Sequence, residues 1–130
     1  MSRHISAFAI VVPSYDDGIS FYVKRAGFHL IEDTDMGNGK RWVLIAPSPD
    51  AETRILLAEA KGDTQIAAIG NQTGGRVGFF LNSDDFDADY QRMSAAGVTF
   101  EEAPRDEPYG KVAVWWDPWG NRWDLLQLKS

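Results

Sequence analysis

The sequence predicts an α+β fold of two βαβββ modules, forming a cup-shaped, partly open mixed β-sheet with the helices on the outside. Apolar residues alternate with a period of two in most segments but recur at helical spacing in residues 15–26 and 84–96. The order strand, helix, strand, strand, strand occurs twice, at a spacing of about 70 residues. We therefore expect one domain, 1–130, of two repeated modules (about 1–60 and 76–130) joined by a connector at 60–75.

The first module begins with a nearly continuous apolar run, which is typical of a strand buried on both faces. Ser14 is a suitable N-cap for the helix at 15–26, and Gly27 is suited to its C-terminal end. Asn38-Gly39 is a strong signal for a β-hairpin. Strands are thus predicted at 5–12, 28–33, 40–46 and 53–59, and a short helix at 63–69 in the connector.

The second module repeats this order and ends in a tryptophan-rich hairpin. Strands are predicted at 77–83, 98–102, 111–116 and 121–128, with a helix at 84–96 and a proline-containing, charged loop at 104–108. Asp117-Pro118-Trp119-Gly120 has the residues of a type I turn. Asp124 lies in the middle of the last strand, among tryptophans. An acid in apolar surroundings requires a partner, a ligand or water.

Composition narrows the class of partner. The 130 residues are 44% hydrophobic and contain no cysteine, which excludes disulfides and thiolate metal sites and fits a cytoplasmic location. The net charge of −6 argues against a nucleic-acid partner. No secretory leader pattern is present, and no apolar run approaches the roughly 20 residues of a membrane helix. We expect a small-molecule ligand, with no nucleic acid and no membrane.

Three stretches together resemble the vicinal oxygen chelate superfamily, which includes glyoxalase I, extradiol dioxygenases and bleomycin-resistance proteins. They are residues 15–22 followed by Gly27-Phe28, residues 84–90 followed by 95–98, and residues 109–125 with their Asp-Pro-Trp-Gly-Asn-Arg-Trp-Asp-Leu run. The resemblance spans nearly the whole chain and implies the two-module fold and a homodimer. It does not select an activity, because one fold supports many.

The resemblance also implies four metal-ligand positions, one on the first and one on the fourth strand of each half. Here these positions fall on Ala7, Ile55 or Leu56, Gly78 and Asp124. One oxygen ligand does not hold a divalent metal, since catalytic sites need about three protein ligands. The two histidines, His4 and His29, lie outside the ligand set. We therefore predict no metal, no other cofactor and no catalytic residue.

Strand parity predicts what lines the cup. If Ala7 faces into the cup, so do Ala9 and Gly78, and these three small residues form its floor. Aromatic residues on the neighbouring strands then form its walls. The predicted ligand-binding residues are Trp42, Gln72, Phe80, Asn82, Tyr109, Trp115 and Asp124. Indole faces provide stacking and cation–π attraction. Two alternatives are that the tryptophans fill the core, and that Asp124 forms a salt bridge with Arg41, Arg54 or Arg122.

The function predicted from these residues is metal-free binding of a small aromatic or cationic compound, as in the drug-sequestering members of the superfamily. The alternative is a divalent-metal-dependent lyase, similar to lactoylglutathione lyase, or a dioxygenase of the same superfamily. A third is a relative that has lost both roles. Whether the protein is an enzyme stays open at this point.

Overall fold

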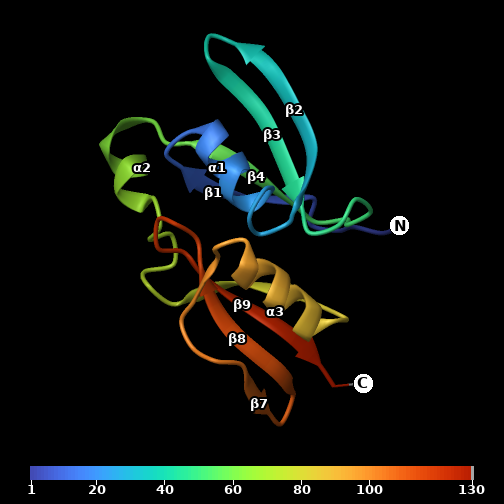
Figure 1. The fold of residues 1–130 in the computed structure, drawn as a ribbon. Coiled ribbons are helices and arrows are strands. Elements are labelled where there is room, and N and C mark those ends of the chain that lie inside the picture. Colours follow the sequence, from blue (N-terminus) through green and yellow to red (C-terminus); the bar gives the residue numbers. More distant parts are fainter. Residues whose placement is uncertain (130) are drawn as a thin grey trace. The chain divides into compact units, whose positions relative to one another are not determined.

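The computed structural model describes residues 1–129, which form nine strands and three helices. The chain divides into two compact units, Met1–Ile69 and Gly70–Ser130. The first holds β1 (Ala7–Val12), α1 (Tyr15–Tyr22), β2 (His29–Gly37), β3 (Lys40–Ala46), β4 (Arg54–Glu59) and α2 (Gly62–Ala68). The second holds β5 (Val77–Asn82), α3 (Phe86–Ala95), β6 (Thr99–Phe100), β7 (Arg105–Glu107), β8 (Gly110–Trp116) and β9 (Arg122–Leu128) (Figure 1).

The predicted α+β class, with two open mixed sheets, is confirmed. The first sheet has the order β1-β4-β3-β2 and the second has β5-β9-β8-β6, with β7 paired to β8. In each sheet the first and last strands of the unit are parallel, and the other pairs are antiparallel. The cup that the two open faces would form together stays a prediction. Within residues 1–129, no helix has the length and apolarity needed to span a membrane.

In the first unit, α1 covers one face of the sheet. The Ser14 hydroxyl caps the helix by accepting a hydrogen bond from the Asp17 amide at 3.0 Å, as predicted. The helix ends at Tyr22, earlier than predicted, and the chain leaves it through a turn that reaches Gly27 at φ +86°. Gly18 allows close packing, because a Cβ there would lie 3.0 Å from a methyl group of Leu57.

The prediction that the first strand is buried on both faces is wrong. Ile10 and Val12 are fully buried, whereas Ala9, on the opposite face, is exposed; Phe8 shares the face of Ile10 but lies near the start of the strand and is 55% exposed. The run is continuously apolar, but α1 packs against only the face of the sheet that carries Ile10 and Val12. The alternation in burial is that of a sheet covered on one side.

The Asn-Gly hairpin is confirmed. β2 and β3 meet at Asn38 and Gly39, whose φ angles of +57° and +77° suit the type I′ turn that joins two twisted strands. β2 continues to Gly37, beyond the predicted end at residue 33, so the hairpin forms a long two-stranded arm (Figure 1). Arg41 stabilises this arm through its ion pair with Asp33, at 2.7 Å.

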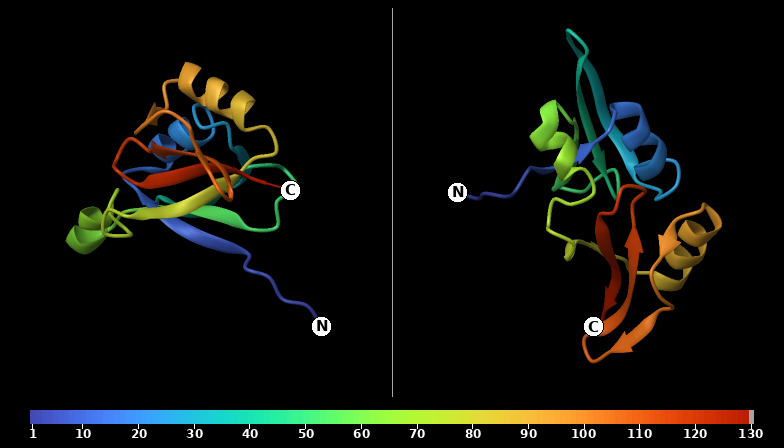
Figure 2. Two further views of the ribbon diagram at one scale, coloured as in Figure 1. Left: turned by 90° about the horizontal axis from the view of Figure 1, so that it is seen from below. Right: turned by 90° about the vertical axis from the view of Figure 1, so that its left-hand side faces the viewer.

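In the second unit, α3 lies across one face of the sheet, as Figure 2 shows. The Gln127 side chain of β9 accepts a hydrogen bond from the Phe86 amide at 2.8 Å, which ties the start of α3 to the sheet. Strand β7 was not predicted, since residues 104–108 resemble a charged loop. It forms because Arg105 and Glu107 pair with Val112 and Gly110 of β8.

The turn between β8 and β9 is organised by a buried carboxylate. Asp117 Oδ1 accepts hydrogen bonds from the amides of Trp119, Gly120 and Asn121 at 2.9–3.0 Å, and its Oδ2 accepts one from the Asn121 side chain. The turn packs against Gly70, where a Cβ would lie 1.8 Å from the Trp119 carbonyl oxygen. This contact joins the start of the second unit to its closing hairpin.

The contact between Gly70 and the turn predicts a large difference between two glycine substitutions. Gly70 and Gly74 have nearly equal φ angles, +71° and +69°, but nothing lies within 4 Å of a Cβ at Gly74. Gly74→Ala should therefore cost only the left-handed strain, about 1 kcal/mol, and Gly70→Ala at least about twice that. Chemical denaturation measures both values, and equal losses would show that the contact at Gly70 is unimportant.

Candidate ligand-binding site

The face of the second sheet opposite α3 brings together three of the predicted ligand-binding residues. Asp124 of β9 pairs with Phe80 of β5 on one side and with Val114 of β8 on the other. Residues paired in neighbouring strands point to the same face, so these three side chains form one row. Asn82 follows in the next row, and Phe80 is 65% exposed. The row places a carboxylate beside an accessible aromatic ring.

Trp115 is not part of this face, and its prediction as a wall of the cup is wrong. The register of β8 and β9 places Trp115 opposite Trp123, with the two rings stacked at 4.8 Å between centroids. Both lie on the face covered by α3, and Trp115 is 0% exposed. The prediction failed because the inward-facing residues of β8 were assigned by matching it to the third strand of the first module. The pairing of β8 with β9 instead places Val114 on the face of Asp124 and Trp115 on the opposite face. For Trp115 and Trp123, the core-filling alternative is correct.

The remaining predicted residues lie elsewhere. Trp42 belongs to β3 in the first unit and is 40% exposed. Tyr109 lies between β7 and β8 and is half exposed, and Gln72 is exposed in a loop near the start of the second unit. The second unit therefore groups Phe80, Asn82 and Asp124, while the roles of Trp42, Tyr109 and Gln72 stay predictions.

The arginines near Asp124 are occupied by other carboxylates. Arg122 pairs with Glu101 at 2.8 Å, and Glu101 also accepts a hydrogen bond from the Trp116 indole at 2.9 Å. Arg105 pairs with Glu102 at 2.7 Å and with Glu107. The hydrogen bonds from Arg122 hold the pKa of Glu101 below its usual range. These pairs leave neither guanidinium in contact with Asp124.

Asp124 is consequently a half-buried acid without a direct partner. Within residues 1–129 its carboxylate forms no ion pair and no side-chain hydrogen bond. Burial raises the pKa of Asp124, and the more distant charges of Arg105 and Arg122 lower it in part. The predicted salt bridge between Asp124 and Arg122 is wrong, since Arg122 pairs with Glu101; Arg41 and Arg54, the other two predicted partners, belong to the first unit.

The four family positions for metal ligands do not provide a suitable donor set. Ala7 and Leu56 lie on the open face of the first sheet, but neither has a donor atom, and Gly78 has no side chain. Only Asp124 supplies an oxygen. Within the described residues, no group of three or more His, Cys, Asp or Glu side chains is placed to hold a metal ion. A divalent cation needs more ligands than these positions provide.

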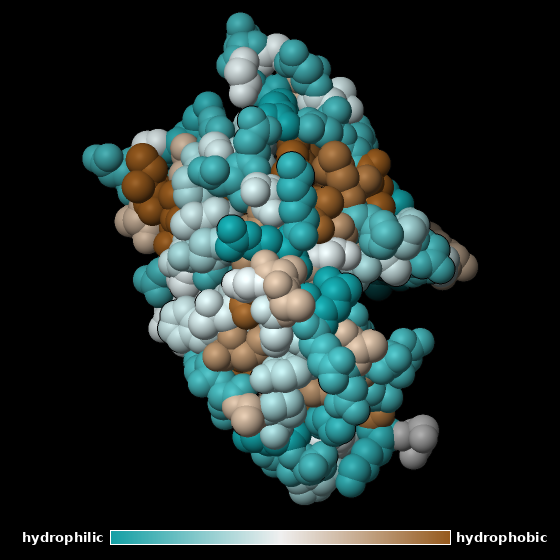
Figure 3. Space-filling model, viewed as in Figure 1, coloured by the Kyte–Doolittle hydropathy of each residue, from teal (hydrophilic) through white to brown (hydrophobic). Residues whose placement is uncertain are grey.

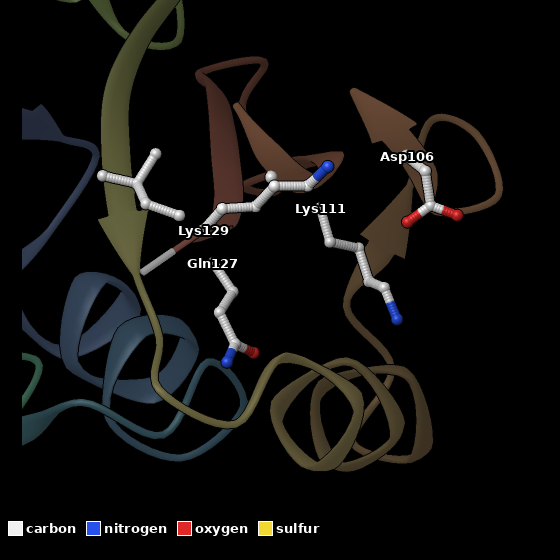
Figure 4. A pocket seen from close by; sticks show the side chains of 6 residues that line it. Asp106, Lys111, Gln127 and Lys129 are labelled. Atoms are coloured by element: carbon white, nitrogen blue, oxygen red, sulfur yellow. The ribbon is translucent and has the colours of Figure 1, made fainter. Parts of the chain in front are cut away.

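Two hollows in the units differ in how their polar groups are used. In the second unit, a pocket of about 550 Å³ is bordered by Asp106, Lys111, Gln127 and Lys129 (Figure 4). Lys111 pairs with Asp87 at 3.3 Å, and Gln127 holds the start of α3, so two of these four groups serve the fold. In the first unit, a pocket of about 470 Å³ is bordered by Trp42 and Arg54. The sequence indicated Trp42, and it suggested Arg54 only as a partner of Asp124.

Comparisons with known proteins agree on one family. The model of the Glyoxalase/Bleomycin resistance protein/Dioxygenase superfamily matches residues 4–125. An uncharacterized protein of Shewanella frigidimarina (strain NCIMB 400) is 48% identical, covering 100% of this chain and 97% of the relative. The crystal structure of UcmS2 has a TM-score of 0.82 at 28% identity, covering 97% of this chain and 98% of its own. TnmS3, an antibiotic binding protein from Streptomyces sp. CB03234, has a TM-score of 0.78 at 31% identity, covering 98% of both chains.

The raised pKa of Asp124 predicts a pH-dependent gain in stability for Asp124→Asn. The folded state favours the protonated acid, so its stabilising effect is complete below the unfolded pKa of about 4 and is lost as pH rises through the folded pKa. Asp124→Asn should therefore be more stable than the wild type at pH 7, with the difference shrinking toward pH 4. Thermal unfolding across this range measures it, with the exposed Asp106→Asn as control. A destabilised Asp124→Asn at pH 7 would reveal an unrecognised partner.

Alanine substitutions of Trp115 and Phe80 should lower the free energy of unfolding by very different amounts. Trp115→Ala removes a fully buried ring and should cost about 3–5 kcal/mol. Phe80→Ala removes a mostly exposed ring and should change the free energy of unfolding by no more than about 0.5 kcal/mol. Urea denaturation of both variants provides the test. A large loss for Phe80→Ala would assign that ring to the core instead.

Proposed function

Because the chain belongs to the glyoxalase/bleomycin resistance protein/dioxygenase superfamily, we propose that it binds a small aromatic or cationic compound without a metal, sequestering it as drug-binding proteins do. The observation that carries the proposal is Asp124, a half-buried acid without a direct partner among residues 1–129, in a row with the exposed ring of Phe80. The likeness to TnmS3, an antibiotic binding protein at 31% identity, supports this kind of ligand.

The two side chains provide complementary interactions. The Phe80 ring offers an accessible π face to a flat or positively charged group, an interaction worth about 0.5–2 kcal/mol. The Asp124 carboxylate, half removed from water, gains most from a ligand that brings a positive charge or a hydrogen-bond donor. Asn82, exposed in the neighbouring row, adds an amide that both donates and accepts. The net charge of −6 favours the approach of cations.

The donor set supports binding that does not depend on a metal. Superfamily enzymes of the metal-dependent class need several ligands on the first and fourth strands of the two halves, and this chain has one oxygen at those positions. Asp124 alone therefore serves better as an anchor for the polar end of a ligand than as part of a metal centre.

We also propose a cytoplasmic homodimer whose principal partner is a small molecule. In addition to the family resemblance, Ile5, just before β1, and Phe8 of β1 are more than half exposed. Figure 3 shows further apolar surface over α2, whose Ile66 is 56% exposed. Sedimentation velocity at micromolar concentration measures the oligomeric state, and a monomer under these conditions would contradict the dimer.

A matched pair of probes tests the proposed site. N-methylquinolinium and its neutral isostere 1-methylnaphthalene differ in one positive charge. The wild type should bind the cation about tenfold more tightly, which corresponds to the roughly 1.4 kcal/mol of a charge-assisted contact. Asp124→Asn should abolish that preference, and Phe80→Ala should weaken both probes. Tryptophan fluorescence titration measures the affinities, with Asp106→Asn as control. An unchanged preference in Asp124→Asn would contradict the assignment of Asp124 as the anchor.

Metal independence has a separate test. Protein stripped with a chelator should bind N-methylquinolinium as tightly as untreated protein, because the proposed contacts involve only side chains. Elemental analysis after exposure to nickel, zinc, manganese and iron should find less than one bound ion per chain. Stoichiometric retention that is lost in Asp124→Ala would instead support a metal-dependent lyase or dioxygenase.

A further inference from the structure

The first unit contains a pocket of about 470 Å³ on the face of its sheet opposite α1. Trp42 and Leu44 of β3 contribute to one side, and Arg54 lies at the start of β4. The segment before β1, the first residue of β1 and the loop between β3 and β4 complete the lining, through His4, Ser6, Ala7, Asp50, Ala51 and Glu52. The pocket thus combines an accessible indole, a leucine and a guanidinium.

Arg54 differs from the other partly buried arginines of the described chain. Arg41 and Arg122, which are also partly buried, each form an ion pair with at least one carboxylate. Arg54 is half-buried, and within residues 1–129 it forms no ion pair. Its Nε is sealed from solvent and has no hydrogen-bond acceptor among the described residues. Leaving a charged donor in this condition is costly unless a ligand supplies the acceptor.

We infer that this pocket binds the oxygen acceptor of a planar aromatic ligand, with a carboxylate or carbonyl on the Arg54 guanidinium and the ring against Trp42. The inference rests on the proposed function and adds to it the chemical class of the ligand. Arg presents several donors in a plane, which suits an oxygen attached to an aromatic ring. The Trp42 ring, 40% exposed, provides the stacking surface.

The acids of the pocket restrict the ligand further. Asp50 and Glu52 are exposed in the loop before β4, and neither forms an ion pair with Arg54. Their charges oppose additional negative groups on a ligand. A ligand with one compact acceptor directed at Arg54 is therefore favoured over a polyanion.

Three naphthalene probes separate these contributions. 2-Naphthoate carries an anionic acceptor, 2-naphthamide a neutral one, and 2-methylnaphthalene none. We expect the wild type to bind both acceptor probes about tenfold more tightly than 2-methylnaphthalene, the ratio that a hydrogen bond to a charged group supports. In Arg54→Gln, all three affinities should agree to within about twofold. Isothermal titration calorimetry measures them, and Arg25→Gln, which removes an exposed arginine outside the pocket, should retain the wild-type ratio.

The outcomes distinguish this inference from the proposed function. If the probes bind but Arg54→Gln retains the preference for acceptors, the inference is wrong and the proposed function stands. If none of these probes binds but N-methylquinolinium does, the inference is overturned and the proposed function stands; if N-methylquinolinium also fails to bind, both are overturned. Arg54→Lys keeps the charge but loses the planar donors, so it should lose most of the preference even if Arg54→Gln unfolds. Asp124→Asn, altered in the other unit, should leave the preference unchanged.

Discussion

The register between β8 and β9 is the constraint on which the second unit depends. Residues paired across the two strands share a face, so the pairing of Trp115 with Trp123 also fixes that of Val114 with Asp124. Asp117 holds this register by gathering the amides of the connecting turn on one carboxylate oxygen. A slip of β9 by one residue would move Trp123 out of the core, away from Trp115, and turn Asp124 toward α3. Core and candidate site are therefore two faces of one hairpin.

Among residues 1–129, each unit leaves a half-buried charge without an ion pair, and the two charges have opposite signs. Asp124 has this status in the second unit because Glu101, Glu102 and Glu107 occupy the neighbouring arginines. Arg54 has it in the first unit, beside Trp42. A half-buried polar group without hydrogen-bond partners lowers the stability of the folded state. A ligand that supplies the missing partner offsets this cost.

Much of the fold was predictable because its signals are local. The Asn-Gly turn, the Ser14 cap and the helical spacing at 15–26 and 84–96 depend on neighbours in the chain, and the structure contains each of these elements. Strand β7 was missed, because Arg105 and Glu107 have no apolar alternation and pair only when β8 lies beside them. The exposure of Ala9 was missed because an apolar run does not reveal how many faces of a sheet are covered.

The sequence by itself determined the residues at the family's ligand positions, and with them the lack of metal donors other than Asp124. It also indicated an acid among aromatics as the centre of interest. Only the tertiary structure decided which aromatics accompany that acid, excluding Trp115 and retaining Phe80. It alone showed that Arg122 is paired with Glu101 while Arg54 lines a pocket without an ion pair. The reason is physical: side-chain identity is local, whereas facing and pairing depend on strand register and on contacts between residues far apart in the chain.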